Sequence, residues 1–421
     1  MSNEISEDKL QPVGRFFVTA LTIAFFAITV SQQIAALLSL DIAKTFFPTN
    51  FLPGSSPELQ ASAIGAVTQI VTVNSLFEVL FALIIGVAAV RLSHKPLLLG
   101  GVVLIIISAV GSYLAPTLWI LGFFFALEGA GTVIVAIMGM TLVGEFLAFN
   151  RKSKAVSYLI AATAAAAVIS APIISLITSF GGWRLNFLLF VMPLSVFGLL
   201  LTFYALPKTQ RTPKAIPMKS MYLTSFKRVL LNRSAAFCLI GGAFIGSATV
   251  GTFALAYYRQ QLGLPLDFAA IVLVVSSLMY VLASLVIGRF VNRVGARILA
   301  LVTTLINGFF IITFFFMPTW LIAFPLDMIH VWCGAAAFTA FSCLALDQVP
   351  NHRATMMSMR SVFSSVGGAV GTALAGAMLI IFGSYQAVGI SFGIMSVASA
   401  GAFLLTRDHT KRPSTDTKYT G

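Results

Sequence analysis

Charged residues are scarce in this chain. Asp, Glu, Lys and Arg make up 9% of its 421 residues, and 58% are hydrophobic, whereas a soluble domain carries about 25% charged residues. So few charged side chains do not suffice to cover a surface that faces water. The composition therefore excludes the soluble globular class and predicts an integral membrane protein.

Cysteine and histidine are also rare. The three cysteines, Cys238, Cys333 and Cys343, lie in apolar runs, and their spacing fits neither a disulfide framework nor a metal site. The four histidines show no metal-ligand spacing, and the sequence has no glycine-rich nucleotide loop. These absences argue against an enzyme and against an ATP-driven pump, and we expect neither a metal nor a cofactor.

Twelve apolar runs are long enough to cross a bilayer, which takes about 20 mostly apolar residues. Pro and Gly separate the runs. The segment before the first run has neither a basic region nor a small-residue cleavage site, so we expect a true first span and no cleaved signal peptide. The predicted spans lie near residues 15–40, 62–90, 97–115, 118–147, 154–179, 185–206, 234–258, 268–290, 297–316, 319–346, 355–381 and 385–406.

Positive charge is distributed unevenly along these spans. Twelve spans put both termini on one side of the membrane. If that side is the cytoplasm, all but three of the 26 Lys and Arg residues fall in the tails, the cytoplasmic loops or the inner ends of spans, as the positive-inside rule requires. The exceptions are Lys44, Arg184 and Arg259. The net charge of +13 thus indicates orientation in a cell (inner or plasma) membrane with cytoplasmic termini, and not nucleic-acid binding.

The second half of the chain repeats the first half after 202 residues. The segment GVAAVRLSHK (86–95) aligns with GRFVNRVGAR (288–297), and Gly181 aligns with Gly383 at the same shift. Six spans repeated in parallel orientation predict two bundles related by an axis along the membrane normal, with a substrate site between them near the midplane.

The repeat and the longest polar break give the domain organisation. Residues 1–206 are predicted to form an N-terminal six-helix bundle, and residues 207–233 a basic cytoplasmic linker. Residues 234–421 are predicted to form a C-terminal six-helix bundle with a short cytoplasmic tail.

The aligned segments share the pattern G-x-x-x-x-R-x-x-x-[KR] after the second and eighth spans. This pattern resembles the cytoplasmic loop motif of the major facilitator superfamily. The resemblance implies an all-α integral membrane fold of twelve transmembrane helices in two parallel-repeat six-helix bundles. It further implies that spans one, four, seven and ten line a cavity, and that spans three, six, nine and twelve face lipid.

Further stretches resemble the drug:proton antiporters of that superfamily. Ala167, Ala171 and Pro172 occupy the positions of a G-x-x-x-G-P motif in span five, where small residues allow close helix packing and proline bends the helix. GGWRLNF (181–187) resembles an outer-loop sequence of those carriers, and LEGAG (127–131) resembles their glycine-bearing stretch in span four. The arginine that those carriers have on this helix corresponds to Phe125.

Span eleven contains the glycine-dense segment VGGAVGTALAG (366–376). We interpret Gly367 and Gly371 as helix-packing residues that allow one helix to rock against another.

Few ionisable residues lie deep in the predicted spans, and all are outside spans three, six, nine and twelve. They are Glu78 in span two, Glu128 in span four, and Asp327 and His330 in span ten, while Arg360 lies about one turn into span eleven. A charge facing lipid is costly, so these groups are expected to face protein or water.

Each deep polar residue has two interpretations. Glu78 and Glu128 are candidates for proton coupling or substrate contact, and Asn74 lies on the same helix face as Glu78. The alternative is that each acid is protonated and bonded to a neighbouring helix. Asp327 and His330, three residues apart, either relay a proton or form a structural pair. Gln32 and Gln33 in span one would contact substrate or pack helices.

Another set of charges lies at cytoplasmic helix ends in repeat-related positions. We interpret them as a gate, with interfacial anchoring as the alternative. The set is Arg91, Glu145, Arg151, Arg293, Arg297, Asp347 and Arg353.

These observations favour a secondary transporter that exports a small neutral, lipophilic or cationic compound in exchange for protons by alternating access. Deep acids, abundant Phe and the absence of Lys or Arg at mid-depth in cavity helices support that substrate class. The alternatives are a proton-coupled uptake symporter for a small metabolite and, in a different class, a non-transporting membrane sensor. The expected partners are the substrate, protons and the lipid bilayer, and we expect a monomer.

Overall fold

The computed structural model describes residues 16–147, 149–206, 227–246, 250–349 and 353–407. Within these residues the chain is helical and has no strand, and eleven helices are long and apolar enough to cross a membrane. A twelfth helix, Phe149–Gly181, has a shorter apolar part, Ala165–Gly181. The prediction of an all-α membrane fold is confirmed.

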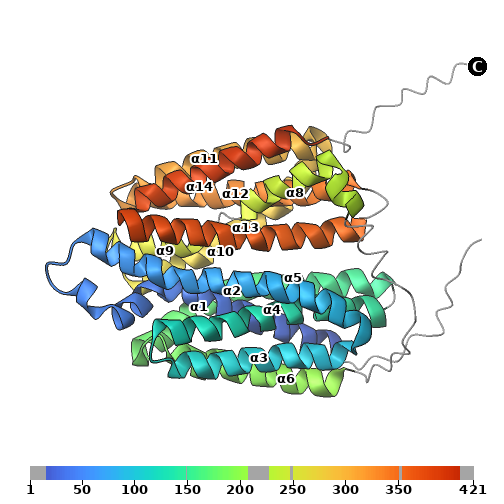
Figure 1. Ribbon diagram of the computed structural model, residues 1–421, viewed down its shortest axis with the longest axis horizontal. Helices are drawn as coiled ribbons and strands as arrows, with labels where there is room; N and C mark the ends of the chain where they lie inside the picture. The colour runs from blue at the N-terminus through green and yellow to red at the C-terminus, as the bar shows by residue number, and fades with distance from the viewer. Residues whose placement is uncertain (1–15, 148, 207–226, 247–249, 350–352, 408–421) are drawn as a thin grey trace, which may run out of the picture. The chain divides into compact units, whose positions relative to one another are not determined.

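The helix bounds agree with most predicted spans to within a few residues. Figure 1 labels α1 (Phe17–Phe46), α2 (Pro57–Arg91), α3 (His94–Leu114), α4 (Leu118–Phe146), α5 (Phe149–Gly181), α6 (Met192–Ala205), α8 (Arg233–Gly246), α9 (Val250–Gln260), α10 (Leu266–Val294), α11 (Ala296–Phe315), α12 (Trp320–Gln348), α13 (Arg353–Phe382) and α14 (Tyr385–Leu404).

The chain forms two compact units. Unit 1 comprises Met1–Ala215, Gly251–Ser277 and Leu379–Gly383, so it joins α1 to α6 with α9, the first part of α10 and the end of α13. Unit 2 comprises Ile216–Val250, Leu278–Met378 and Ser384–Gly421, and it holds α8, α11, α12, α14 and the remainder of α10 and α13.

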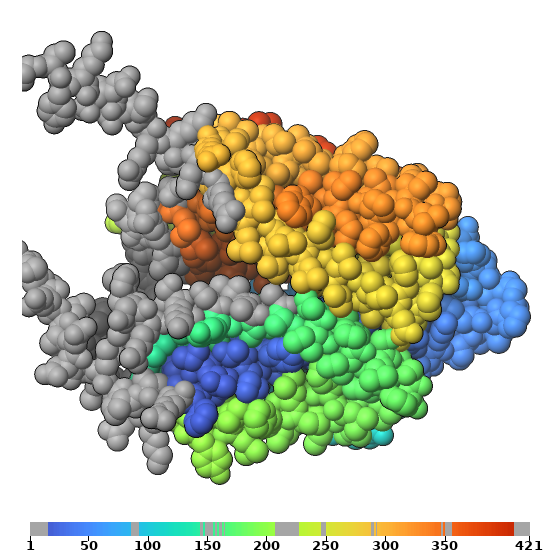
Figure 2. Space-filling model, turned by 180° about the vertical axis from the view of Figure 1, so that it is seen from behind, coloured from blue at the N-terminus to red at the C-terminus, as the bar shows by residue number. Residues whose placement is uncertain are grey.

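Helices at repeat-related positions pack in the same way in the two units. In unit 1, α3 packs on α4 and α6, and α1 also packs on α4 and α6. In unit 2, α11 packs on α12 and α14, and α8 packs on α12 and α14. The start of α1, in blue, borders α5 and α6, in green, on the surface seen in Figure 2. The sequence repeat is therefore also a repeat of helix packing.

The last basic residue of each loop motif binds the C-terminal end of a helix. The Nζ of Lys95 donates to the carbonyl of Phe203 at 2.7 Å, at the end of α6. The guanidinium of Arg297 donates to the carbonyls of Phe403, at 3.1 Å, and Leu404 at the end of α14. A cation satisfies the orphan carbonyls of a helix end and interacts favourably with the helix dipole. In both units this contact ties the start of one helix to the end of another.

The two motif copies differ at the turn. Gly295 has φ +99°, a conformation that is strained for residues with a side chain. The equivalent Ser93 has φ −66° and ordinary extended backbone. Glycine is therefore required in the second copy and not in the first.

Large apolar side chains remain exposed on the outer faces of several helices. Leu285, Phe309 and Ile381 are each about two-thirds exposed, as expected of a surface that meets lipid chains. Asn307, the most polar deep group of α11, instead is 6% exposed and points toward Gly334 of α12. The polar group of this helix therefore faces protein.

Gly367 marks a close approach of α13 to α8. A Cβ added to Gly367 would overlap the carbonyl group of Ala243 on α8, whereas a Cβ on Gly401 of α14 would meet open space. We expect Gly367→Ala to force α13 away from α8 and to cost about 1–3 kcal/mol of stability. The measurement is the thermal unfolding temperature of the purified protein in detergent.

Gly401→Ala is the matched control for this prediction, because it is the same substitution in a helix of the same unit. It removes backbone freedom without a clash, so the unfolding temperature should stay the same or rise. Equal unfolding temperatures for the two variants would contradict the close approach.

Candidate proton and substrate site

The candidate site in unit 1 depends on a close contact between α2 and α4. A Cβ at Gly129 of α4 would overlap the carbonyl of Asn74 on α2, so only glycine permits this approach. The side-chain amide of Asn74 donates to the carbonyl of Phe125 at 2.9 Å, which fixes α2 against α4. Asn74 is thus engaged in helix packing.

This contact places the carboxyl groups of Glu78 and Glu128 in the same region of unit 1. Glu78 follows Asn74 by one helical turn, and Glu128 precedes Gly129 in the chain. The two acids are close enough to interact electrostatically. Gln32 of α1 donates from its amide to Oε1 of Glu78 at 2.9 Å. Three helices therefore contribute to one acidic cluster, and we call Gln32, Glu78 and Glu128 the carboxyl cluster.

Glu128 is the most enclosed member of the carboxyl cluster. Its side chain is fully buried, and neither carboxyl oxygen has a hydrogen-bond partner in standard geometry within the described residues. The hydroxyl of Ser31, itself 2% exposed, is its polar neighbour on α1. A buried carboxylate without partners is costly, whereas the protonated acid is far cheaper to bury. The arrangement is suited to a group that exchanges a proton.

A second polar group lies in unit 2. Asp327 and His330, one turn apart on α12, are both buried, and His330 Nδ1 lies 3.6 Å from Asp327 Oδ1. This separation exceeds hydrogen-bond length. The predicted pairing on one helix face is present, and a water molecule or a substrate atom would be needed to pass a proton between the two side chains.

Arg360 of α13 contacts a hydroxyl group and two aromatic rings. Its Nη2 donates to the hydroxyl of Ser342 at 2.6 Å. The guanidinium lies over the rings of Phe338 and Phe341, with 4.6 and 5.3 Å to their centroids. Tyr280 of α10 is also near it. Aromatic faces stabilise a cation by cation–π attraction, so Arg360 is held without a carboxylate in the described part of unit 2.

Unit 1 also contains an ion pair that the sequence reasoning missed. Both terminal nitrogens of Arg259, on α9, bind the carboxylate of Asp41, near the end of α1. The side chains of Arg259 and Asp41 are 8% and 24% exposed. Arg259 Nη1 additionally donates to the carbonyl of Leu37 at 3.2 Å. The available signal was that Arg259 is an exception to the positive-inside count and therefore needs a specific partner.

Two further bonds in unit 1 join other helices. Ser175 of α5 donates to the carboxylate of Asp267 at the start of α10, and the amide of Gln260 donates to the carbonyl of Pro57 at 3.1 Å. In each bond one partner belongs to the first repeat and the other to the second. We call the Asp41–Arg259 and Ser175–Asp267 contacts the latch.

The segment GGWRLNF fastens the same end of the first repeat. Trp183 Nε1 donates to the hydroxyl of Thr45 at 2.9 Å, and Arg184 donates to the carbonyl of Ala115 at 2.8 Å while lying over the Trp183 ring. Asn186 is fully buried and donates to the hydroxyl of Thr178 at 2.7 Å. Arg184, another exception to the positive-inside count, is therefore held by specific contacts.

The other predicted site residues differ in burial. Gln33 is half-buried on α1, Ala171 is buried in α5, Pro172 is exposed within that helix, and Ala167 is half-buried. Gly371 is buried in α13. Of the predicted gate, Arg293 is exposed at the end of α10, and Arg297 binds the end of α14. The side chains of Arg91, Glu145, Arg151, Asp347 and Arg353 lie outside the part of the chain that the structure describes.

Comparisons with known proteins support the fold. The sequence matches the family model of the Major Facilitator Superfamily over residues 15–265 and again over residues 236–419. No curated protein sequence matches it.

Solved structures with a similar fold include three transporters. A D-xylose-proton symporter has a TM-score of 0.74 at 16% identity, covering 94% of this chain and 99% of that one. A bacterial homologue of the human lysosomal transporter Spinster, inward-facing and unoccupied, has a TM-score of 0.73 at 16% identity, with 93% and 96% covered. The nucleoside transporter NupG has a TM-score of 0.72 at 15% identity, with 92% and 99% covered.

Proposed function

Because the chain belongs to the major facilitator superfamily and is therefore a multi-pass membrane transporter, we propose that it exports a small neutral, lipophilic or cationic compound in exchange for protons. The carboxyl cluster is the observation that carries this proposal. We place the protein in the cell membrane with cytoplasmic termini, acting as a monomer, with the two predicted bundles as its moving parts.

The carboxyl cluster supports proton exchange through its electrostatics. Glu128 is buried and Glu78 is half-buried beside it, and two neighbouring carboxyl groups disfavour double ionisation. A cationic or hydrogen-bond-donating substrate replaces a proton as the partner of the carboxylate. Gln32 keeps Glu78 oriented while Glu128 gains or loses its proton. Substrate and proton thus compete for one site, which is the requirement for exchange.

The latch supports alternating access. It joins α1 and α5 of the first repeat to α9 and α10 of the second at the end of the helices that the charge distribution places outside. Breaking these contacts opens that end, and re-forming them closes it. A proton or substrate bound at the carboxyl cluster shifts the balance between the open and closed states when it binds one state more tightly than the other.

Uptake by symport on the same fold is the second candidate function. Phe125 occupies the position of the arginine that the antiporters carry on span four, and its ring packs edge-to-face on Phe187 with 6.0 Å between centroids. This helix therefore lacks the guanidinium that accompanies proton antiport in those relatives. The direction of coupling in the experiment below distinguishes the two functions.

Replacing either acid of the carboxyl cluster tests the proposal. In proteoliposomes with an imposed pH gradient, we expect Glu78→Gln or Glu128→Gln to reduce the gradient-driven component of transport by at least about tenfold, the factor that 1.4 kcal/mol corresponds to. The amide has nearly the shape of the acid and is unable to carry the proton. The substrates assayed are lipophilic cations, sugars and amino acids, and Asp327→Asn is measured in parallel.

Glu58→Gln is the matched control, because it makes the same change at the exposed start of α2. It should transport like the original protein. Full gradient-driven transport in all three deep variants would refute proton exchange by these acids. Substrate accumulation along the proton gradient, instead of extrusion against it, would favour the symporter. Absence of transport for every compound, with intact folding, would favour a sensor.

The latch gives a structural prediction. Asp41→Asn leaves the buried guanidinium of Arg259 without its counter-charge, and loss of one partner of a desolvated pair costs about 2–5 kcal/mol. We therefore expect the closed outer end to open. Spin labels at the exposed positions Lys44 and Gln261, in a protein whose native cysteines are replaced, would report this as a longer pulsed-EPR distance.

The exchanged pair Asp41→Arg with Arg259→Asp provides the rescue. It restores opposite charges, so the label distance should return toward that of the original protein. An unchanged distance in Asp41→Asn would show that the ion pair does not hold the outer end closed.

A further inference from the structure

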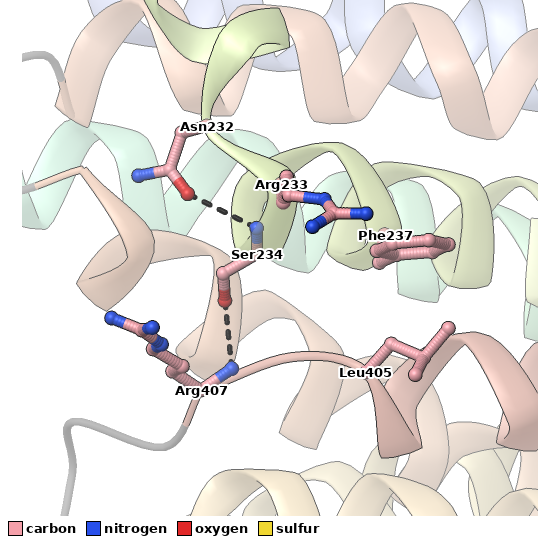
Figure 3. Close-up of a pocket in the computed structure, with 6 residues that line it drawn as sticks. All are labelled: Asn232, Arg233, Ser234, Phe237, Leu405 and Arg407. Atoms are coloured by element: carbon pink, nitrogen blue, oxygen red, sulfur yellow. Dashed lines mark hydrogen bonds between the residues drawn. The ribbon is translucent and has the colours of Figure 1, made fainter.

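A cavity of about 540 Å³ lies in unit 2, where α8 begins and α14 ends. The residues that line it come from these two helix ends and are drawn in Figure 3: Asn232, Arg233, Ser234, Phe237, Leu405 and Arg407. It involves neither the carboxyl cluster nor the latch. The transport function proposed above leaves this cavity without a role.

The polar wall of the cavity is preformed. The backbone N–H of Arg407 donates to the hydroxyl of Ser234 at 2.7 Å, and that hydroxyl donates to the side-chain oxygen of Gln348. The buried amide of Gln348 donates in turn to the carbonyl of Arg407 at 2.9 Å. These bonds join α8, α12 and the end of α14, so a ligand meets a fixed frame.

The charge of the cavity is positive. Arg233 and Arg407 are both exposed and stand on opposite sides of Ser234 in Figure 3. Within the described residues neither guanidinium forms an ion pair with a carboxylate. The cavity also lies at the N-terminal, positive end of the α8 dipole, whose first turn is capped by Asn232 through the N–H groups of Ser234 and Ala235 at 3.1 and 3.3 Å. The site therefore favours an anion.

The remaining wall is apolar. Phe237 is half-buried, and Leu405 is 59% exposed. Leu231, just before the cavity, is 70% exposed. An inorganic anion would contact the guanidiniums alone, whereas an amphiphile would contact both the guanidiniums and these apolar side chains. The apolar surface and the two guanidiniums together match a ligand with a phosphate and a hydrocarbon chain.

We propose that this cavity binds an anionic phospholipid. Arg233 and Arg407 hold the headgroup phosphate by charge-assisted hydrogen bonds, and the acyl chain runs over Phe237 and Leu405. Basic pockets between membrane helices are suited to such headgroups. The lipid bridges the start of α8 and the end of α14, and it stabilises the packing of these helices.

The test is lipid binding to the delipidated full-length protein. Native mass spectrometry and thermal unfolding are measured with phosphatidylglycerol, with phosphatidylcholine and with inorganic phosphate. We expect phosphatidylglycerol to bind and to raise the unfolding temperature more than phosphatidylcholine does. Arg233→Gln and Arg407→Gln should each weaken phosphatidylglycerol binding by about tenfold or more, as loss of a charge-assisted bond implies.

Arg228→Gln is the matched control, since it removes one exposed positive charge just before the cavity without altering its lining. It should bind phosphatidylglycerol like the original protein. Leu405→Gln tests the acyl-chain contact and should weaken phosphatidylglycerol binding while leaving inorganic phosphate unaffected.

Three results would overturn the proposal. The first is unchanged phosphatidylglycerol binding in both arginine variants. The second is an equal loss of binding in Arg228→Gln, which would indicate general charge attraction. The third is equal protection by inorganic phosphate, which would indicate a simple anion site. Each variant is first compared without lipid, so that a folding defect is recognised. All of these readouts are independent of transport.

Discussion

A carboxyl group inside a membrane must either be protonated or have a polar or charged partner for its carboxylate. This constraint governs the first repeat. The contact between Gly129 and Asn74 allows the backbones of α2 and α4 to meet, and it thereby brings Glu78 and Glu128 into one site. A side chain at Gly129 would separate the helices, and with them the two acids. The proton-exchange proposal rests on this one backbone approach more than on either acid alone.

The same constraint explains the positive charges that the orientation rule did not account for. Arg259 and Arg184 lie at the end predicted to be outside, and each has dedicated partners: the carboxylate of Asp41 for one, and the Ala115 carbonyl and the Trp183 ring for the other. A positive-inside bias acts on charges that are otherwise free. Charges that hold helix ends together are placed where the helices require them.

The sequence predicted the helices well and the contacts between helices poorly. Span limits follow from hydrocarbon thickness and from Pro and Gly, so α3, α4 and α12 lie within three residues of their predicted limits. The neighbourhood of Glu78 and Glu128 was not predicted, because the register of two helices depends on which small residue permits the closest approach. The Asp41 ion pair was missed because its partner is more than 200 residues away in the chain.

The two repeats share a scaffold but differ in their polar chemistry. Lys95 and Arg297 make equivalent contacts with the ends of α6 and α14, so the shared motif is used for packing in both. Glu78, by contrast, corresponds to Tyr280, which lies near Arg360 in unit 2. The first repeat has an acid at this position, and the second has a tyrosine near a guanidinium that lies over aromatic rings. Since the shared scaffold holds a tyrosine at this position in the second repeat, it does not itself require the acid at Glu78.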